Sequence, residues 1–258
     1  MAVSGRSPSD NNLISIQHRN MKYVILAAGL GSRFAKNGEK KPKPLVEIDG
    51  QPMIGRLIDI LMKHGGEQIN IVANSRMPEL VEYLEDLKSK GYPLVVRPII
   101  SDNSYYSLSE AAEGVDGRFI AMTVDTIFPQ KEFEEYVRQS EAMPDDAVLM
   151  GLTRFIDDES PLYARLGADG NVIDYRYGGE PFAEGAIVSA GLYALNDKAM
   201  KTVAEREGYP ESLSDFQRIL AAETDIKVVP FEFSKAMDVD CLHDQKVAEE
   251  FLKEIAEK

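Results

Sequence analysis

Hydrophobic and polar positions alternate along the first half of the chain in blocks that suit strands and helices in turn. Segment 22–27 (KYVILA) is a nearly continuous apolar run, which is typical of a strand buried on both faces. In segment 52–64 the apolar residues recur at helical spacing. The same patterns predict strands at 68–74, 94–97 and 118–124 and helices at 78–90, 107–114 and 131–142.

The second half continues with more strand-like segments. Apolar runs predict strands at 147–154, 187–195 and 226–233, and 162–177 contains an Asp-Gly turn signal between two strand-like arms. Helices are predicted at 212–222 and 243–258. The whole pattern predicts an α/β fold: a single three-layer α/β/α domain with a mixed, mostly parallel sheet.

Length and composition agree with one domain. A chain of 258 residues has room for one large domain or two small ones, and it contains no repeat, low-complexity tract or long linker. We therefore expect one domain over 21–258. Residues 1–20 are polar and lack the apolar core of a secretory signal, which predicts a flexible extension and a cytoplasmic protein.

Charge and cysteine content exclude several function classes. The chain has 29 basic and 43 acidic residues, a net charge of −14 that disfavours broad nucleic-acid binding. No apolar run approaches the roughly 20 residues that span a bilayer, so no membrane association is expected. Cys241 is the only cysteine, which excludes an internal disulfide and a cysteine-rich metal site.

A glycine-rich loop follows the first predicted strand. It reads LAAGLGSRF, and its backbone amides and Arg33 are suited to phosphate oxygens. A dinucleotide fingerprint is disfavoured because Phe34 stands at the third glycine position, and a P-loop pattern is absent. An ordinary strand-to-helix turn remains the structural alternative.

A stiffly mounted lysine lies shortly after this loop. Lys43 stands between Pro42 and Pro44, and proline restricts the backbone on both sides. A solvated basic loop would explain the lysines equally well. A phosphate cradle, an arginine and this lysine within a short stretch together favour a phosphate-binding site.

Two aspartates are candidates for metal binding, since Mg²⁺ takes one or two carboxylates together with phosphates and waters. Asp125 ends a predicted strand, and ligands of open α/β sheets sit outside the carboxyl ends of strands. Asp240 lies in the segment MDVDCLHD, two residues from Asp238, so the two share a face if that segment is extended. A turn or cap role is the alternative for Asp125.

These motifs resemble those of the NTP-transferase superfamily, which includes sugar-1-phosphate nucleotidyltransferases and bacterial choline-phosphate cytidylyltransferases. The family pattern is roughly L-A-[AG]-G-x-G-[ST]-R, a spacer, then P-K-P-L and a glycine shortly after, and every part is present. The ending around Asp240 resembles the family pattern D-[IV]-D-T-x-x-D, except that Cys241 stands where threonine is usual. The resemblance implies a Rossmann-like fold of the nucleotide-diphospho-sugar transferase type.

The resemblance also implies roles for individual residues. Arg33, Lys43 and Asp125 are the expected catalytic residues, and Asp125 and Asp240 are the expected Mg²⁺ ligands. The expected nucleotide-binding residues are Leu26, Ala27, Ala28, Gly29, Gly31, Ser32 and Arg33. Segment 103–108 is a candidate for the base side of the site.

The expected acceptor site is carried by less specific motifs. The resemblance places it at YRYGGE and SAGLY, and implies the acceptor-binding residues Arg176, Glu180, Gly191 and Lys235. Gly191 is expected to give clearance for a ring. The three charged residues fit a solvated surface equally well.

The resemblance implies that the protein transfers a nucleoside monophosphate from an NTP to a sugar 1-phosphate and releases pyrophosphate. Its expected partners are an NTP and a small phosphorylated acceptor, with Mg²⁺ as cofactor. An alcohol phosphate such as phosphocholine is the alternative acceptor. A catalytically silent nucleotide-sensing module is the alternative from another class. The motifs leave the base, the acceptor and the oligomeric state open.

Overall fold

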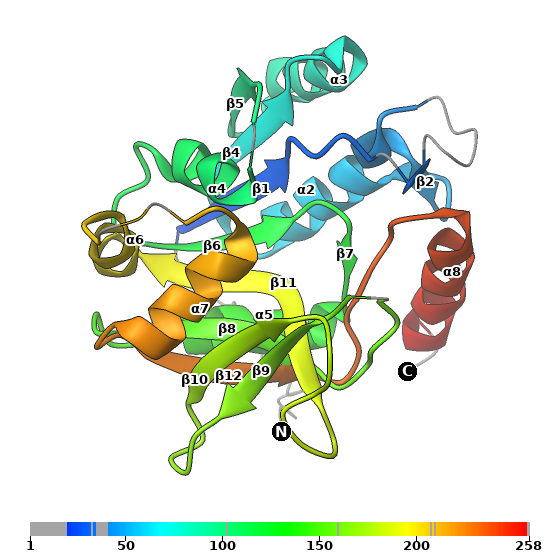
Figure 1. Cartoon of the computed structure of the whole chain (residues 1–258). Coiled ribbons are helices and arrows are strands. Elements are labelled where there is room, and N and C mark those ends of the chain that lie inside the picture. Colours follow the sequence, from blue (N-terminus) through cyan, green and yellow to red (C-terminus); the bar gives the residue numbers. More distant parts are fainter. Residues whose placement is uncertain are drawn as a thin grey trace, which may run out of the picture.

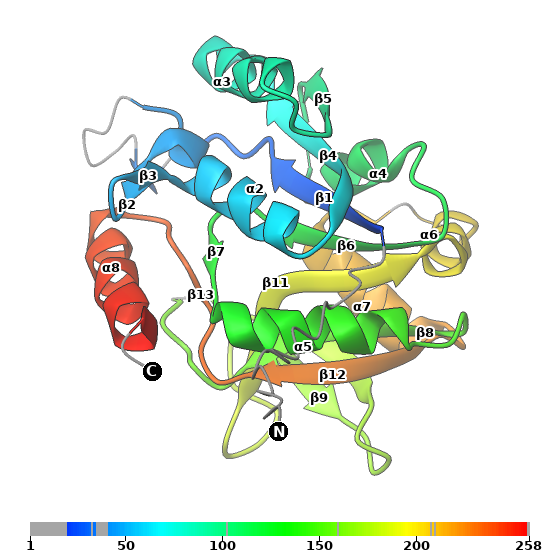
Figure 2. The same cartoon turned by 180° about the vertical axis from the view of Figure 1, so that it is seen from behind.

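The computed structural model describes residues 20–31, 33–34, 41–101, 103–158, 160–206, 208 and 210–256. Within these residues, one mixed sheet of nine strands has the order β5-β4-β1-β6-β11-β8-β12-β10-β9. Helices lie against both faces of this sheet (Figures 1 and 2). The predicted α/β fold with a mixed sheet is therefore confirmed.

Most of the elements predicted from the hydrophobic pattern are present. The main-sheet strands are β1 Met21–Ala27, β4 Gly66–Asn74, β5 Leu94–Ile99, β6 Arg118–Thr123, β8 Ala147–Thr153, β9 Leu162–Leu166, β10 Val172–Tyr177, β11 Ile187–Asn196 and β12 Lys227–Phe233. The helices are α2 Met53–Lys63, α3 Pro78–Ser89, α4 Ser104–Ala112, α5 Gln130–Glu141, α6 Asp197–Ala204, α7 Leu213–Glu223 and α8 Leu242–Ala256.

Several short elements were not predicted. They are the 3₁₀ turn η1 Lys43–Leu45 and the two-residue strands β2 Glu47–Ile48, β3 Gln51–Pro52, β7 Thr126–Ile127 and β13 Met237–Asp238. Helix α6 was also missed, and α4 begins earlier than the apolar pattern suggested because Asn103 caps it by accepting a hydrogen bond from Tyr106 N. The predicted extension at 1–20 lies, except for Asn20, outside the described residues.

The first half of the sheet is parallel. Strand β1 lies between β4 and β6, and β5 pairs with β4, all in parallel register. The carboxyl ends of these strands therefore meet at one edge of the sheet. The glycine loop after β1 and the turn after β6 both lie at that edge.

The second half of the sheet is mostly antiparallel. Strand β11 runs antiparallel to β6, β8 and β9, whereas β8 and β12 pair in parallel. Because β11 pairs with both β8 and β9, the strands β8, β12, β10, β9 and β11 close into a ring. The prediction of a mostly parallel sheet is therefore wrong for this half.

The physical reason for the closure lies in β11. Its register against β8 shifts between Ser189 and Tyr193, and Gly191 within this stretch has φ +74°. An irregularity of this kind bends a strand and increases its twist. The bend lets the first residues of β11 pair with β9 while the last ones pair with β6.

Two hydrophobic cores fill the space between the sheet and its helices. One core contains Ile54 of α2 and Phe133 of α5 beneath one face. The other contains Leu108 of α4 and Phe216 of α7 beneath the opposite face. Figures 1 and 2 show the helices that contribute to these cores on opposite sides of the sheet. No helix in the described part of the chain is both long enough and apolar enough to cross a bilayer.

Candidate active site

The backbone of the glycine loop packs closely against the side chain of Lys43 in η1. Gly31 has φ +61°, and a Cβ atom built on it would lie 2.6 Å from Lys43 Cβ. Both the backbone angle and the contact therefore require glycine. Phe34, at the far end of the loop, is buried in a small core together with Ile48 and Val239. The two sequence motifs thus form one unit of structure.

Lys43 is the central residue of the site. Its side chain is only 9% exposed, and its Nζ donates hydrogen bonds to Asp125 and Asp240. Arg33 Nη1 also donates to Asp240 Oδ2, at 2.7 Å. The structure therefore brings together Arg33, Lys43, Asp125 and Asp240, which lie up to 207 residues apart along the chain.

Two short strands position the aspartates. Strands β7 and β13 pair antiparallel, and Val239 N donates to Asp125 O at 3.1 Å. Beyond β13, Asp244 Oδ2 accepts hydrogen bonds from Asp240 N at 2.8 Å and Cys241 N at 2.9 Å. Asp244, in the first turn of α8, thus reaches back to the segment before the helix and fixes the backbone that carries Asp240.

The charges of this cluster support one another. Burial alone would lower the pKa of Lys43, but Asp125 and Asp240 raise it above the usual range of lysine. Burial raises the pKa of Asp125, yet the ammonium of Lys43 outweighs this effect and leaves that pKa below its ordinary value. Asp238 has accessible surface in a cavity, but desolvation by the surrounding protein and the charge of Asp125 raise its pKa to about 7.

The carboxylates fit a hard cation. Within the described residues there is no group of three or more His, Cys, Asp or Glu residues that could hold a metal. Magnesium needs fewer protein ligands, since phosphates and waters complete its shell. Asp125 and Asp240 converge on one ammonium, and Oδ1 of Asp125 is buried without a well-aligned hydrogen-bond partner. A buried carboxylate oxygen without a partner is costly, so this donor set suits a shared Mg²⁺.

The smaller of two cavities lies over the glycine loop and has a volume of about 510 Å³. One wall is the loop with Lys43, and the other is the start of α4. Its lining residues include Leu26, Ala28, Gly29, Gly31, Arg33, Ser101, Asn103, Ser104 and Ser107. Ala27 does not line it, because its side chain is buried in the core beneath the sheet. Ser32 lies outside the described residues.

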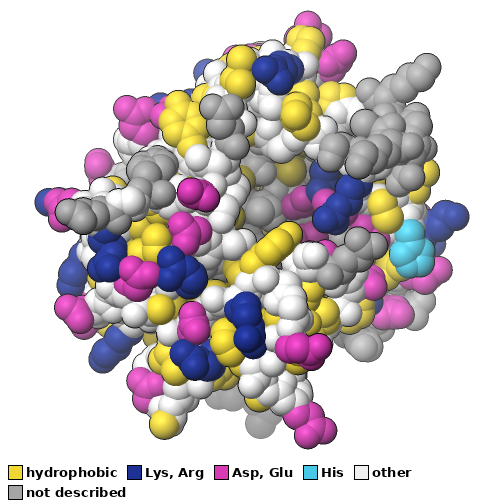
Figure 3. All heavy atoms as spheres, viewed as in Figure 1, with side chains coloured by type: hydrophobic (Ala, Val, Ile, Leu, Met, Phe, Trp, Pro, Cys, Tyr) yellow, Lys and Arg dark blue, Asp and Glu magenta, His cyan; other side chains and the backbone are white. Residues whose placement is uncertain are grey.

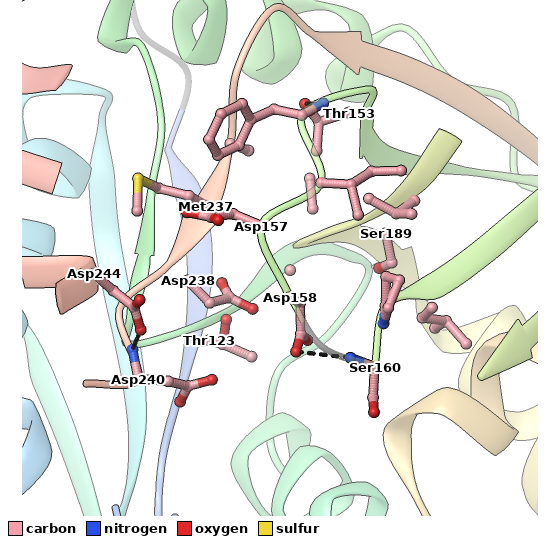
Figure 4. Close-up of a pocket in the computed structure, with 18 of the residues that line it drawn as sticks. Thr123, Thr153, Asp157, Asp158, Ser160, Ser189, Met237, Asp238, Asp240 and Asp244 are labelled. Atoms are coloured by element: carbon pink, nitrogen blue, oxygen red, sulfur yellow. Dashed lines mark hydrogen bonds between the residues drawn. The ribbon is translucent and has the colours of Figure 1, made fainter. Parts of the chain in front are cut away.

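The larger cavity, of about 730 Å³, lies over β11 between the segment that follows β8 and the start of α7. Figure 4 shows Asp238, Asp240 and Thr123 on one side of it and Ser160 and Ser189 on the other. In the space-filling view of Figure 3, this face of the molecule is hollowed near its centre. Acidic and basic side chains stand beside the hollow.

The two cavities adjoin. Arg33, Thr123, Leu213 and Asp240 line both of them. Lys43 and Asp125 line the smaller cavity at the same boundary. A ligand in each cavity would therefore have one end at the cluster of cations and carboxylates.

The structure does not bring the predicted charged acceptor residues to the larger cavity. Arg176 lies over the ring of Phe182, at 4.2 Å from the guanidinium carbon to the ring centroid, and Glu180 is exposed. Lys235 lies between the rings of Phe155 and Phe251. None of the three predicted charged residues is among the described residues that line either cavity.

Gly191 lines the larger cavity, and the space where its side chain would be is occupied by neighbouring side chains. A Cβ atom there would lie 2.4 Å from Thr126 Oγ1 and 2.8 Å from Thr123 Oγ1. The absence of a side chain therefore lets β11 approach the two threonines, and the expectation that this glycine leaves room for a ring stays a prediction.

Sequence reasoning missed most polar residues of the larger cavity. Asp157, Asp158 and Ser160 come from the segment between β8 and β9, and Gln217 comes from the buried face of α7. An Asp-rich connecting segment reads as a solvated loop, and a glutamine within a helix gives no local signal. Only the pairing of β11 with β8 and β9 shows that these segments face one space.

Comparison with known proteins decides the family. Residues 23–166 match the model of the MobA-like NTP transferase domain. The chain belongs to this family. The resemblance inferred from the sequence motifs is thereby confirmed, and the matched residues of this NTP transferase domain include the glycine loop, Lys43 and Asp125.

Relatives of this NTP transferase domain cover the chain to different extents. The bifunctional IPC transferase and DIPP synthase of Archaeoglobus fulgidus is 30% identical over 271 residues, 100% of this chain and 51% of that protein. The choline-phosphate cytidylyltransferase of Streptococcus pneumoniae is 35% identical over 102 residues, 39% of this chain and 43% of that protein. The chain spans about half the length of the curated relatives it matches.

Solved structures share the fold of this NTP transferase domain. The inositol-1-phosphate CTP transferase from T. maritima superposes with a TM-score of 0.72 at 21% identity, over 92% of this chain and 97% of that chain. A likeness at this identity supports the fold.

Proposed function

We propose that this protein transfers a nucleoside monophosphate from an NTP to a small, ring-shaped polyol monophosphate and releases pyrophosphate. Sugar 1-phosphates and inositol 1-phosphate belong to this acceptor class. The observation that carries the proposal is the junction of two cavities at Arg33, Lys43, Asp125 and Asp240. A donor in one cavity and an acceptor in the other would meet at that junction.

The smaller cavity suits the nucleotide. The backbone of Gly29 and Gly31 can approach phosphate oxygens closely, and Arg33 offers a fork of donors to them. At the other wall, Ser107 Oγ donates to Ser101 Oγ at 2.7 Å, and Ser101 Oγ donates to Asn103 O at 2.6 Å. This hydrogen-bonded wall lies beyond the loop and is the proposed place of the base.

Charge balance supports a requirement for Mg²⁺. Arg33 and Lys43 contribute two positive charges, and Asp125 and Asp240 contribute two negative ones. A cluster with no net charge does not compensate a triphosphate by itself. Asp125 and Asp240 would hold Mg²⁺, which when bound supplies the positive charge that neutralises the phosphates. Lys43 would then direct its ammonium to the phosphates instead of the carboxylates.

The proposed reaction needs no covalent enzyme intermediate and no general base. The acceptor phosphate is largely a dianion at neutral pH, because its second pKa is about 6. One of its oxygens forms a bond to the α-phosphorus, while the bond from that phosphorus to the pyrophosphate oxygen breaks and its electron pair leaves with pyrophosphate. Arg33 and Lys43 stabilise the negative charge on the phosphoryl groups, and the glycine loop holds their orientation.

The larger cavity favours a hydroxylated acceptor over phosphocholine. A quaternary ammonium is usually recognised by the faces of several aromatic rings. In this cavity Phe155 already has Lys235 over its ring at 4.5 Å, and Tyr177 is 65% exposed. Serine, threonine and carboxylate side chains line the cavity beside apolar ones such as Ile156 and Met237, and the polar groups can hydrogen-bond to hydroxyls. The T. maritima protein of similar fold is an inositol-1-phosphate CTP transferase, and inositol 1-phosphate is a hydroxylated acceptor of this class.

Pyrophosphate release tests the proposal. The four NTPs are each combined with glucose 1-phosphate, inositol 1-phosphate and phosphocholine, with and without Mg²⁺. We expect release that requires one NTP, one acceptor and Mg²⁺, and that falls by a factor on the order of 10²–10³ in Asp125→Asn. Asp116→Asn, which removes an exposed carboxylate outside both cavities, is the matched control.

Two outcomes would contradict the proposal. Tight NTP binding without release for any pair would favour a nucleotide-sensing module. Release that is unchanged in Asp125→Asn would show that the reaction centre lies elsewhere.

A further inference from the structure

A pair of hydrogen-bonded side chains forms the polar floor of the larger cavity. Ser189 Oγ on β11 donates to Gln217 Oε1 on α7 at 2.9 Å, and both residues line the cavity. Gln217 is only 2% exposed although it is polar. Tyr193, which is also buried, lies beside both residues. A polar floor of this kind is costly to bury unless it has partners.

The hydrogen-bonding capacity of Gln217 is not used up. A glutamine amide has two N–H donors and an oxygen with two acceptor sites. Within the described part of the chain, its Nε2 donates to Leu213 O at 3.3 Å and to the hydroxyl of Tyr193, and its Oε1 accepts from Ser189. Leu213 belongs to the same helix, so this contact is a long bond within one turn. One acceptor site on Oε1 therefore remains for a ligand in the cavity.

The floor lies at a suitable distance from the junction of the cavities. Gly191 packs against Thr123, which lines both cavities, and Ser189 precedes Gly191 by two residues on β11. Two residues of a regular strand span about 7 Å, and the irregular backbone at Gly191 can only shorten this. A six-membered ring whose phosphate is at the junction is therefore long enough for its far hydroxyl to reach the floor.

We propose that Gln217, held in place by Ser189, reads one ring hydroxyl of the acceptor and thereby selects a polyol monophosphate. A ring hydroxyl can donate to the open acceptor site of the amide oxygen. A trimethylammonium group has no such proton to donate, and a deoxy ring would leave that acceptor site without its partner. The inference rests on the proposed function and adds the residue that determines the acceptor.

The test compares each acceptor with its deoxy analogues. Glucose 1-phosphate and inositol 1-phosphate are assayed for pyrophosphate release beside their monodeoxy derivatives and phosphocholine. The enzymes are wild type, Gln217→Leu and Ser189→Ala, with Gln139→Leu on the exposed face of α5 as the matched control. Circular dichroism melting and the KM for the NTP show whether each variant is folded.

For wild type we expect one deoxy analogue to have a kcat/KM lower than its parent by about 10- to 100-fold. Gln217→Leu should lose a similar factor on the parent and should no longer distinguish the parent from that analogue. Ser189→Ala should also reduce the difference in kcat/KM between the parent acceptor and that analogue. The KM for the NTP should stay unchanged, and Gln139→Leu should behave as wild type.

A purely structural role for Gln217 gives a different result, because kcat/KM would then fall by the same factor for the parent and every analogue. That result overturns the inference, and so does a wild-type preference for phosphocholine. If wild type releases no pyrophosphate with any pair, the proposed function fails and the inference falls with it. If wild type reacts but Gln217→Leu keeps its selectivity, only the inference fails.

Discussion

At the scale of single residues, the site is organised around Lys43. Its ammonium stands between two carboxylates that compete for it, and the backbone of Gly31 closes over its Cβ. Lys43 can be buried only because both carboxylates offset the cost of desolvating its charge. The glycine and the lysine are therefore coupled, although twelve positions separate them along the chain.

Gly31→Ala tests this coupling. We expect the free energy of unfolding to fall by about 1–3 kcal/mol and NTP binding to weaken. Alanine is strained at the positive φ of this position, and its Cβ would collide with Lys43. Gly50→Ala is a matched control, since Gly50 also has positive φ (+76°) but has nothing within 4 Å of its Cβ position. Calorimetric titration with an NTP and thermal melting distinguish the two. Equal effects of both substitutions on NTP affinity would contradict the coupling.

At the scale of elements, two connections to α8 shape the site. Asp244, in the first turn of α8, fixes the backbone of Asp240, which binds Lys43 and Arg33. Lys235 lies 4.5 Å from the ring centroids of Phe155 and Phe251, and so joins the segment after β8 to α8. Helix α8 thus supports the smaller cavity through one contact and the larger cavity through the other.

Asp244→Ala should affect both stability and rate. Loss of the two backbone hydrogen bonds that Asp244 accepts should cost about 1 kcal/mol, and freeing the backbone of Asp240 should lower kcat beyond what that instability explains. Asn196→Ala provides the comparison, because Asn196 caps α6 by accepting from Ala199 N and lies outside both cavities. Denaturant unfolding and steady-state kinetics measure the two effects. A kcat equal to that of Asn196→Ala would show that Asp244 does not position Asp240.

Lys235→Met should act on the acceptor side alone. Removing the cation from the two rings should cost about 1–2 kcal/mol and raise the KM for the acceptor, because Phe155 and the segment behind it lose their tie to α8. The KM for the NTP should not change. Arg176→Met removes a cation from the ring of Phe182 outside the cavity and should leave both KM values unchanged. A higher acceptor KM in Arg176→Met would instead support the acceptor role predicted for that residue.

At the scale of the whole molecule, the site lies where the two halves of the sheet meet. The parallel half supplies the glycine loop and Asp125 at the carboxyl ends of its strands. The antiparallel half closes through β11 and supplies the larger cavity. Ligands bound across the junction would therefore stabilise the folded domain as one unit.

Thermal melting with ligands tests this expectation. An NTP with Mg²⁺ at about 100 times its Kd should stabilise wild type by about 2.7 kcal/mol, which is on the order of 5–10 °C in Tm for a domain of this size. NTP or Mg²⁺ alone should give a smaller shift. In Asp125→Asn the additional shift from Mg²⁺ should disappear. Equal shifts with and without Mg²⁺ in wild type would contradict a shared metal site at Asp125 and Asp240.

Local chemistry explains what the sequence determined by itself. The buried strand β1, its glycine loop and the proline-flanked Lys43 could be predicted, because apolar runs, glycine and proline act on the backbone where they stand. The alternation of strands and helices likewise indicated an α/β domain. Asp125 and Asp240 were recognisable as acids next to predicted elements, but their meeting was implied only through the family resemblance.

Contacts between distant segments decided the rest. The two-residue strands β7 and β13, which bring Asp125 to Asp240, are too short to leave a hydrophobic pattern. The closure of the second half depends on a bend in β11 and on its pairing with both β8 and β9. The same tertiary packing turned Arg176 and Lys235 onto aromatic rings and brought Gln217 to Ser189. Such side chains acquire their partners from strand pairing and helix packing, which only the folded chain establishes.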